Sequence, residues 1–169
     1  MDAVKAILTR RSIRKYRPDP VPEELVKTLL EAAMSAPSAR NQQPWHFVVI
    51  RSREILNRIP EYHPYAQMCR EAPLAIAVCG DPELATSKDF WPLDCAAATE
   101  NILIAANALG LGAVWVSVYP REDRIKFMKE ILRLPDHVIP LALVPVGFPA
   151  EEKPPEYRYN PARVHYDRW

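Results

Sequence analysis

The sequence predicts an α+β sandwich, and two observations carry this prediction. Helical and extended apolar patterns alternate along the 169 residues, but they lack the regular connections of roughly two to six residues that typify doubly wound folds. The chain also contains 18 prolines against 4 glycines, and neither G-x-G-x-x-G nor G-x-x-x-x-G-K occurs in it. Because it offers no Rossmann loop and no P-loop, side-chain cations would have to hold any cofactor phosphate.

The first half of the chain predicts two helices and two strands. Residues 2–9 have the apolar spacing of a short amphipathic helix. A second helix spans 22–36, because a proline suits its first turn and two glutamates lie near its positive end. The apolar runs WHFVVI at 45–50 and LAIAVC at 74–79 are typical of buried strands.

The second half predicts a long helix, a strand, another helix and a final strand. The long helix spans 92–109 and is rich in alanine, which suits either the close approach of a flat ligand or a central place in the core. Gly110 caps its end. We expect a strand at 113–119, an amphipathic helix at 121–133 and a last, central strand at 138–148.

Residues 149–169 form a proline-rich tail that cannot be regular helix. Aromatic residues are uncommon in disordered tails and enriched at interfaces. The tail has four such rings, at Tyr157, Tyr159, Tyr166 and Trp169. We therefore expect it to dock on another surface, with a tail folded back on its own subunit as the alternative.

Composition and charge exclude several classes of protein. Hydrophobic residues make up 49% and charged residues 25%, and the net charge of +1 gives no reason to expect nucleic acid as a partner. The N-terminus is too charged for a signal peptide, and no apolar run approaches the length of a membrane span. We expect one cytoplasmic domain over residues 1–169, with no membrane partner.

The cysteines and histidines predict no metal centre. Cys69, Cys79 and Cys95 are widely spaced without a C-x-x-C pair, which argues against both a zinc site and a disulfide framework. We expect all three to be buried, inert thiols. The four histidines are scattered, with no pair at i and i+4, so they do not resemble a ligand set either.

The segment 10–17 has five cations in eight residues of a nearly neutral protein. Guanidinium forks with the Ser12 hydroxyl between them suit a phosphate, because the fork pairs bidentately with its oxygens. A solvated basic turn is the alternative, and spacing alone does not separate the two. DNA binding is disfavoured, since no second basic patch accompanies the segment.

The loop at 36–45, A-P-S-A-R-N-Q-Q-P-W, gathers side-chain amides and a hydroxyl between a helix end and a strand. Such groups could form hydrogen bonds with the polar edge of a heterocycle. Taken alone, the loop is better explained by Ser38 and Asn41 capping a turn.

Together these segments resemble the nitroreductase family. R-R-S-I-R-x-Y at 10–16 and A-P-S-A-x-N-x-Q-P-W at 36–45 match two of its motifs. The stretch at 94–115 is similar to its central helix and the following strand, and L-P-x-H-V-I-P-L-A-L-V-P-V-G-F-P at 134–149 resembles its last strand and exit turn. The four motifs occur in the family's order.

The resemblance implies a mostly antiparallel sheet flanked by helices and an obligate homodimer, with the tail reaching over the partner. Each of two FMN sites would take residues from both chains. Arg10 and Ser12 would face the phosphate and ribityl chain, and Arg14 the N1/O2 edge of the ring. A basic phosphate contact near the C-terminus matches Arg158, with Lys153 as the weaker candidate. The implied cofactor-binding residues are Arg10, Arg11, Ser12, Arg14, Pro37, Ser38, Ala39, Asn41, Gln43, Val116, Ser117, Val118 and Arg158.

The family places backbone groups near flavin N5 and O4 at the positions of 116–118. Many members carry Glu-Gly where this chain has Ser117-Val118, a change that bears on substrate preference. The resemblance implies an oxidoreductase that uses NADH or NADPH to reduce FMN, which then reduces a nitroaromatic, a quinone or a similar small acceptor by a ping-pong route. No protein acid or base is required, so no catalytic side chain is predicted. The alternatives are dehalogenation, flavin destruction, or flavin binding without turnover.

Overall fold

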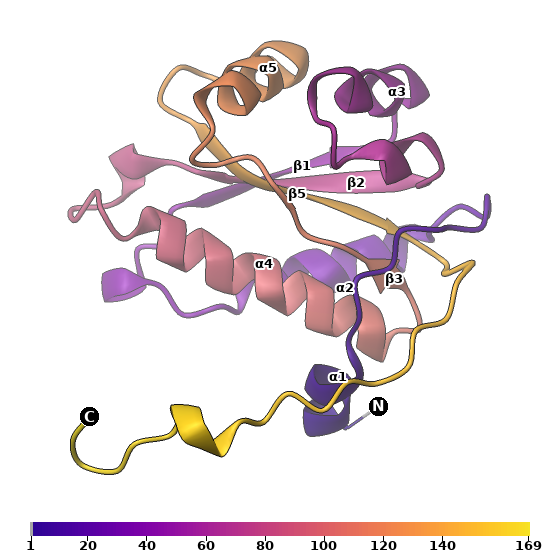
Figure 1. The fold of residues 1–169 in the computed structure, drawn as a ribbon. Helices are drawn as coiled ribbons and strands as arrows, with labels where there is room; N and C mark the ends of the chain where they lie inside the picture. Colours follow the sequence, from indigo (N-terminus) through magenta and orange to yellow (C-terminus); the bar gives the residue numbers. More distant parts are fainter. Residues whose placement is uncertain (1) are drawn as a thin grey trace.

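The computed structural model describes residues 2–169 of the chain. Figure 1 shows helices on both faces of a central sheet, with α1 and the C-terminal tail below it. In chain order the elements are α1 (Ala3–Thr9), α2 (Glu23–Met34), η1 (Ala39–Asn41), β1 (Trp45–Ile50), α3 (Arg53–Tyr62), η2 (Gln67–Arg70), β2 (Leu74–Gly80), η3 (Pro82–Leu84), α4 (Trp91–Ala108), β3 (Gly112–Ala113), β4 (Val116–Ser117), α5 (Glu122–Leu132), β5 (Ile139–Gly147) and η4 (Pro161–Arg163).

The sheet has the strand order β1-β2-β5-β3, and β4 also pairs with β5. All four strand pairings are antiparallel. Helices α3 and α5 cover one face, while α2 and α4 cover the other, with α1 beside α4 (Figure 1). The predicted α+β architecture and its antiparallel sheet are therefore confirmed.

The predicted strand at 113–119 was wrong as a single paired element. Residues 112–113 and 116–117 pair with β5 in one common register, but the ladder is interrupted between them. In that register Pro145 lies opposite Val114, and a proline has no N–H to donate to a neighbouring strand. The carbonyl of Pro145 accepts the Tyr16 hydroxyl at 3.2 Å instead. The strand therefore splits into β3 and β4.

Helix α4 is the central helix of the core. Ala98, Ile102 and Ala106 have no exposed surface, and they belong to the cluster that also includes residues of α2 and of the strands β2 and β5. Of the two explanations offered for the alanine-rich sequence, a central place in the core is therefore the right one for the fully buried alanines of α4. Their small side chains allow close packing. Gly110 ends the helix with a φ of +75°, as its predicted capping role requires.

Sequence analysis did not predict α3. Its local signals are present: Ser52 Oγ accepts from the N–H of Ile55 at 3.4 Å, and Leu56 and Ile59 are fully buried three residues apart. Pro60 argues against a helix in the sequence, because proline disfavours a helix interior. It lies in the last turn of α3, however, where it does not prevent the preceding turns from forming. The helix covers the sheet face that β1 and β2 share.

The three cysteines are buried and unpaired, as predicted. Burial raises the pKa of each thiol to about 12, because a thiolate would lose its solvation there. At neutral pH they remain protonated and unreactive.

The segment that follows α1 runs along the edge of the sheet next to β3. The Ile13 N–H donates to Ala113 O at 3.0 Å, and Ala150 N–H donates to Lys15 O at 2.9 Å. This close approach depends on Gly112, where an added Cβ would come within 2.6 Å of the Ile13 side chain. The segment thereby brings the N-terminal arginines beside the start of the C-terminal tail.

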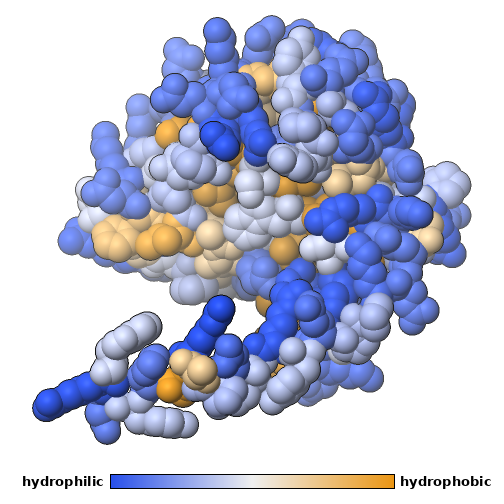
Figure 2. All heavy atoms as spheres, in the orientation of Figure 1, coloured by the Kyte–Doolittle hydropathy of each residue, from blue (hydrophilic) through white to orange (hydrophobic). Residues whose placement is uncertain are grey.

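The tail passes along α1 and then leaves the body of the chain. Residues 155–159 line a cleft with residues of α1, whereas Figure 2 shows the end of the tail as an arm that stands clear of the body. Tyr157 is 87% exposed, Tyr166 83% and Trp169 101%, so in the single chain these rings have almost no cover. The alternative of a tail folded back on its own subunit is therefore wrong for residues 160–169. In the described part of the chain, 2–169, no helix is both long and apolar enough to cross a membrane.

Candidate functional site

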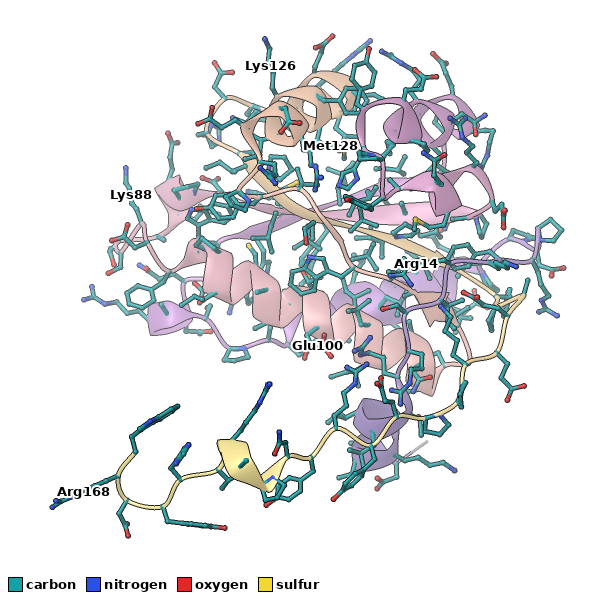
Figure 3. The ribbon with its side chains drawn as sticks, in the orientation of Figure 1. Arg14, Lys88, Glu100, Lys126, Met128 and Arg168 are labelled. Atoms are coloured by element: carbon teal, nitrogen blue, oxygen red, sulfur yellow. The ribbon has the colours of Figure 1, made fainter. Side chains whose placement is uncertain are left out.

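The first two arginines of the basic segment lie at the junction of α1, α4 and the tail. The Nε atom of Arg10 lies 3.3 Å from a carboxylate oxygen of Glu100, which Figure 3 shows on the side of α4 nearest α1. Arg11 donates from Nε to the Pro154 carbonyl at 2.9 Å. Its Nη2 is buried and has no hydrogen-bond partner among the described residues. This buried guanidinium nitrogen is a donor that a bound anion could satisfy.

Arg158 of the tail lies in the same place. A cleft of about 580 Å³ is lined by side chains of α1, of Glu100 and of residues 155–159, including Arg10, Arg11 and Arg158. Arg158 pairs with Glu156 at 2.9 Å, and this guanidinium, with Arg11 as a smaller contributor, lowers the pKa of the Glu156 carboxyl. The structure thus brings Arg158 beside Arg10 and Arg11, which lie at the other end of the sequence, and we call this group the arginine cleft. Such a donor set suits a phosphate.

Ser12 and Lys153 lie beside the arginine cleft but have other partners. Ser12 forms a bridge with Ala113, and its carbonyl accepts the Lys153 ammonium at 2.6 Å. Lys153 also pairs with Glu151 at 3.3 Å. The backbone N–H of Arg14 donates to the same Glu151 carboxylate and, with Lys153, lowers its pKa. Both candidates are paired with a nearby glutamate, and of the two only Arg158 lines the arginine cleft.

Arg14 points into a second cleft of about 530 Å³, on the other side of the segment. Figure 3 shows Arg14 at the edge of the sheet. Two further predicted residues, Val116 and Ser117, line this cleft, which we call the ring cleft. Val118 does not line it: the residue is fully buried, and its N–H donates to Leu141 O at 3.0 Å.

The carbonyl of Ser117 is held from two sides. His63 Nε2 lies 2.8 Å from it, and Arg124 donates to it at 3.1 Å. His63 is buried, and its Nδ1 has no hydrogen-bond partner among the described residues. Burial lowers the pKa of His63, so the ring is neutral at pH 7. Its Nε2 must then carry the proton that the carbonyl accepts, which leaves Nδ1 as an acceptor.

The loop that contains the second motif lies elsewhere in the chain. The Ala39 N–H donates to Asp94 of α4 at 3.0 Å, and Ser38 Oγ accepts the N–H of Gln43 at 2.9 Å. Asn41 and Gln43 join by their side chains at 3.0 Å, and both have φ values above +50°. Pro37 lies exposed at the entrance of the loop. The turn-cap role of Ser38 is confirmed, and the loop is held in a left-handed conformation that non-glycine residues seldom adopt.

The two predicted halves of the site do not meet within one chain. Helix α4 separates them, because the loop is bound at Asp94 while α1 is bound at Asn107, whose side chain donates to Ala6 O at 2.9 Å. Thirteen residues of helix correspond to ~20 Å along its axis. Arg10 itself pairs with Glu100, six residues or ~9 Å along the helix from Asp94, but neither the arginine cleft nor the ring cleft is lined by a residue of the loop.

Sequence analysis missed several residues of the ring cleft. His63, Tyr65, Gln67 and Arg124 line it together with Arg14. They come from the end of α3, from η2 and from α5, and no local pattern connects these segments. Only the packing of α3 and α5 on the same face of the sheet brings them together.

The fold and the two clefts define an α+β protein with one basic cleft, one mixed cleft and a projecting tail. The sequence profile of the nitroreductase family matches residues 7–63 and 60–148, which contain most of both clefts. The chain belongs to the nitroreductase family.

Three similar proteins make the relationship more specific. A protein of Methanothermobacter thermautotrophicus, provisionally named NADH dehydrogenase/NAD(P)H nitroreductase, is 50% identical over 169 residues, which are 100% of this chain and 88% of the relative. A crystal structure of the same provisional name from Parabacteroides distasonis has a TM-score of 0.95 at 43% identity, covering 99% of this chain and 98% of that one. A provisionally named nitroreductase from Desulfovibrio desulfuricans, solved in complex with FMN, has a TM-score of 0.85 at 30% identity and covers 100% and 98%.

Proposed function

We propose that the chain is an FMN-dependent oxidoreductase that uses NADH or NADPH to reduce a nitroaromatic, a quinone or a similar small acceptor by a ping-pong route. The names of the relatives support the class of activity and the cofactor. The observation that carries the proposal is the arginine cleft, where Arg10, Arg11 and Arg158 converge and one buried guanidinium nitrogen has no partner. The three residues fit a phosphate monoester such as that of FMN.

The proposed site takes residues from two copies of the chain. Arg10, Ser12 and Arg14 of one subunit would hold the phosphate, the ribityl chain and the polar edge of the ring. The loop 37–43 of the partner would cover the ring from the other side, since the loop of the same chain lines neither cleft.

Exposed apolar surface supports a homodimer. Helix α1 has Ile7 53% exposed and Leu8 65% exposed, and both line the arginine cleft with the tail. Leu93 on α4 is 64% exposed, and the tail rings have almost no cover. A partner subunit would bury these exposed groups, which are the apolar face of α1, Leu93 at the start of α4 and the aromatic rings of the tail.

When bound, FMN accepts a hydride at N5 and passes reducing equivalents to the acceptor, so the protein's task is binding, orientation and electrostatics. Arg14 would place a cation at the N1/O2 edge, where negative charge develops on reduction. His63 and Arg124 fix the Ser117 carbonyl and so hold the backbone of 116–117 at the ring. The partner loop and the tail would exclude water from the ring.

The test is reduction and reoxidation of the purified, FMN-loaded protein without oxygen. We expect about one FMN per chain, a dimer by sedimentation, and loss of flavin absorbance on mixing with NADH or NADPH. A nitroaromatic or quinone added afterwards should restore the absorbance, and initial rates should give parallel double-reciprocal plots. If neither NADH nor NADPH bleaches the bound flavin, the protein binds flavin without turnover and the proposed activity is wrong. A monomer with full FMN occupancy would refute the shared site.

A further inference from the structure

Two histidines and two carboxylates converge at one end of the sheet, away from both clefts. His46 is the second residue of β1, Asp81 follows β2, and His137 precedes β5. These three strands are neighbours in the order β1-β2-β5. Trp45 pairs with Gly80, and Gly80 pairs with Ile139. His46, Asp81 and His137 therefore lie at neighbouring strand ends, at the same end of the sheet.

Both histidines point at the same oxygen atom. His46 Nε2 lies 3.3 Å from Asp81 Oδ2, and His137 Nε2 lies 3.6 Å from that atom. The Asp81 side chain is only 7% exposed, whereas the imidazoles are about half exposed. Glu83 completes the group, since its carboxylate and those ligand atoms of Asp81 and His137 all lie within 4.8 Å of one another.

One distance in this group is close to those of a metal coordination shell. In a tetrahedral zinc site with bonds of about 2.0–2.2 Å, neighbouring ligand atoms lie about 3.3–3.6 Å apart. His137 Nε2 lies 3.6 Å from Asp81 Oδ2, and the ligand atoms of Asp81, Glu83 and His137 all lie within 4.8 Å of one another. We propose that Asp81, Glu83 and His137 bind a Zn²⁺ ion, while His46 contacts the Asp81 carboxylate.

The structure also orients the central ligand. The other oxygen of Asp81, Oδ1, accepts the N–H of Glu83 at 2.9 Å and caps η3. This bond fixes the carboxylate so that Oδ2 faces the histidines, which is the usual task of a hydrogen bond to a metal-ligating group. An imidazole beside two carboxylates suits zinc better than Mg²⁺ or Ca²⁺, which prefer oxygen ligands alone.

The ion would stabilise the loop of the second motif. The N–H of Asp81 donates to Pro44 O at 2.9 Å, at the end of that loop. Five residues after Asp81, the N–H of Thr86 donates to the Gln42 side chain at 2.9 Å, and the Thr86 hydroxyl accepts from Arg40 at 3.1 Å. A metal at Asp81 would therefore tie segment 81–86, and with it the loop, to the ends of β2 and β5.

The experiment is calorimetric titration of ZnCl₂ into tag-free, FMN-loaded protein in a buffer that does not chelate zinc. We expect one Zn²⁺ per chain, and His137→Gln should weaken its binding at least about 10-fold. The matched control is His165→Gln, because His165 lies in the tail, stacked on Trp169, and should leave zinc binding unchanged. Zinc at about 100 times its dissociation constant should raise the Tm of the wild type by about 5 °C or more, but not that of His137→Gln.

Flavin content without zinc shows whether each variant is folded. X-ray absorption of the zinc-loaded protein should show nitrogen and oxygen neighbours at about 2.0–2.2 Å with imidazole scattering. No stoichiometric binding up to about 100 μM would overturn the proposal. So would equal binding by wild type and His137→Gln, or a sulfur shell at about 2.3 Å.

Discussion

Arg10→Ala separates phosphate recognition from every other part of flavin binding. A charge-assisted hydrogen bond from Arg10 to the FMN phosphate is worth about 1.5–3 kcal/mol. In the free protein Arg10 already pairs with Glu100, and an ion pair as exposed as this one contributes at most about 1 kcal/mol. The net loss of FMN affinity should therefore lie between about 0.5 and 3 kcal/mol, or roughly 2- to 160-fold in Kd.

The assay is flavin fluorescence titration of apoprotein with FMN and, in parallel, with riboflavin, which has no phosphate. Riboflavin affinity should change little in Arg10→Ala. Glu100→Gln should strengthen FMN binding up to about 5-fold, because the phosphate would no longer compete with a carboxylate for Arg10. Arg51→Ala is the matched control, since Arg51 forms a similar exposed pair with Glu23 remote from the cleft. Equal losses for FMN and riboflavin would refute the placement of Arg10.

Three further results are expected. Arg14→Ala should lower the two-electron potential of the bound flavin by several tens of millivolts, about 30 mV for each 1.4 kcal/mol, and an unchanged potential in spectroelectrochemical titration would contradict its position at N1/O2. Truncation after Phe148 should weaken the dimer and FMN binding together in sedimentation and flavin assays; a fully flavinated micromolar dimer would make the tail dispensable. The pKa of His63 is lowered in the folded state, so below about pH 6.5 the unfolded chain binds more protons than the folded one. As the pH is lowered through this range, the free energy of unfolding should decrease by at most about 1.4 kcal/mol per pH unit. His63→Gln should flatten this dependence in urea titrations, and an equal slope would exclude His63 as its source.

Periodicity in the sequence was sufficient to predict most elements, because the driving force for them is local. The strands β1 and β2 are apolar runs of β-branched and small residues, and α2 and α5 repeat apolar residues at helical spacing, so burial of one face dictates each structure. The split of β3 from β4 could not be predicted in this way, since it depends on which residue of β5 lies opposite Val114. That residue is Pro145, and only strand register places it there.

The sequence by itself determined the family, through four motifs in the family's order that include the cluster of arginines and the loop rich in amides. Which of these groups share a cleft was decided only by tertiary structure. Arg158 joins Arg10 because the tail returns along the N-terminal segment, while the loop 37–43 is bound at Asp94 and does not line the cleft. Likewise, scattered histidines gave no local sign of a metal site, yet the antiparallel register brings His46 and His137 to one oxygen of Asp81. Spacing along a chain reports only neighbours within one element, whereas a sheet aligns residues of any separation.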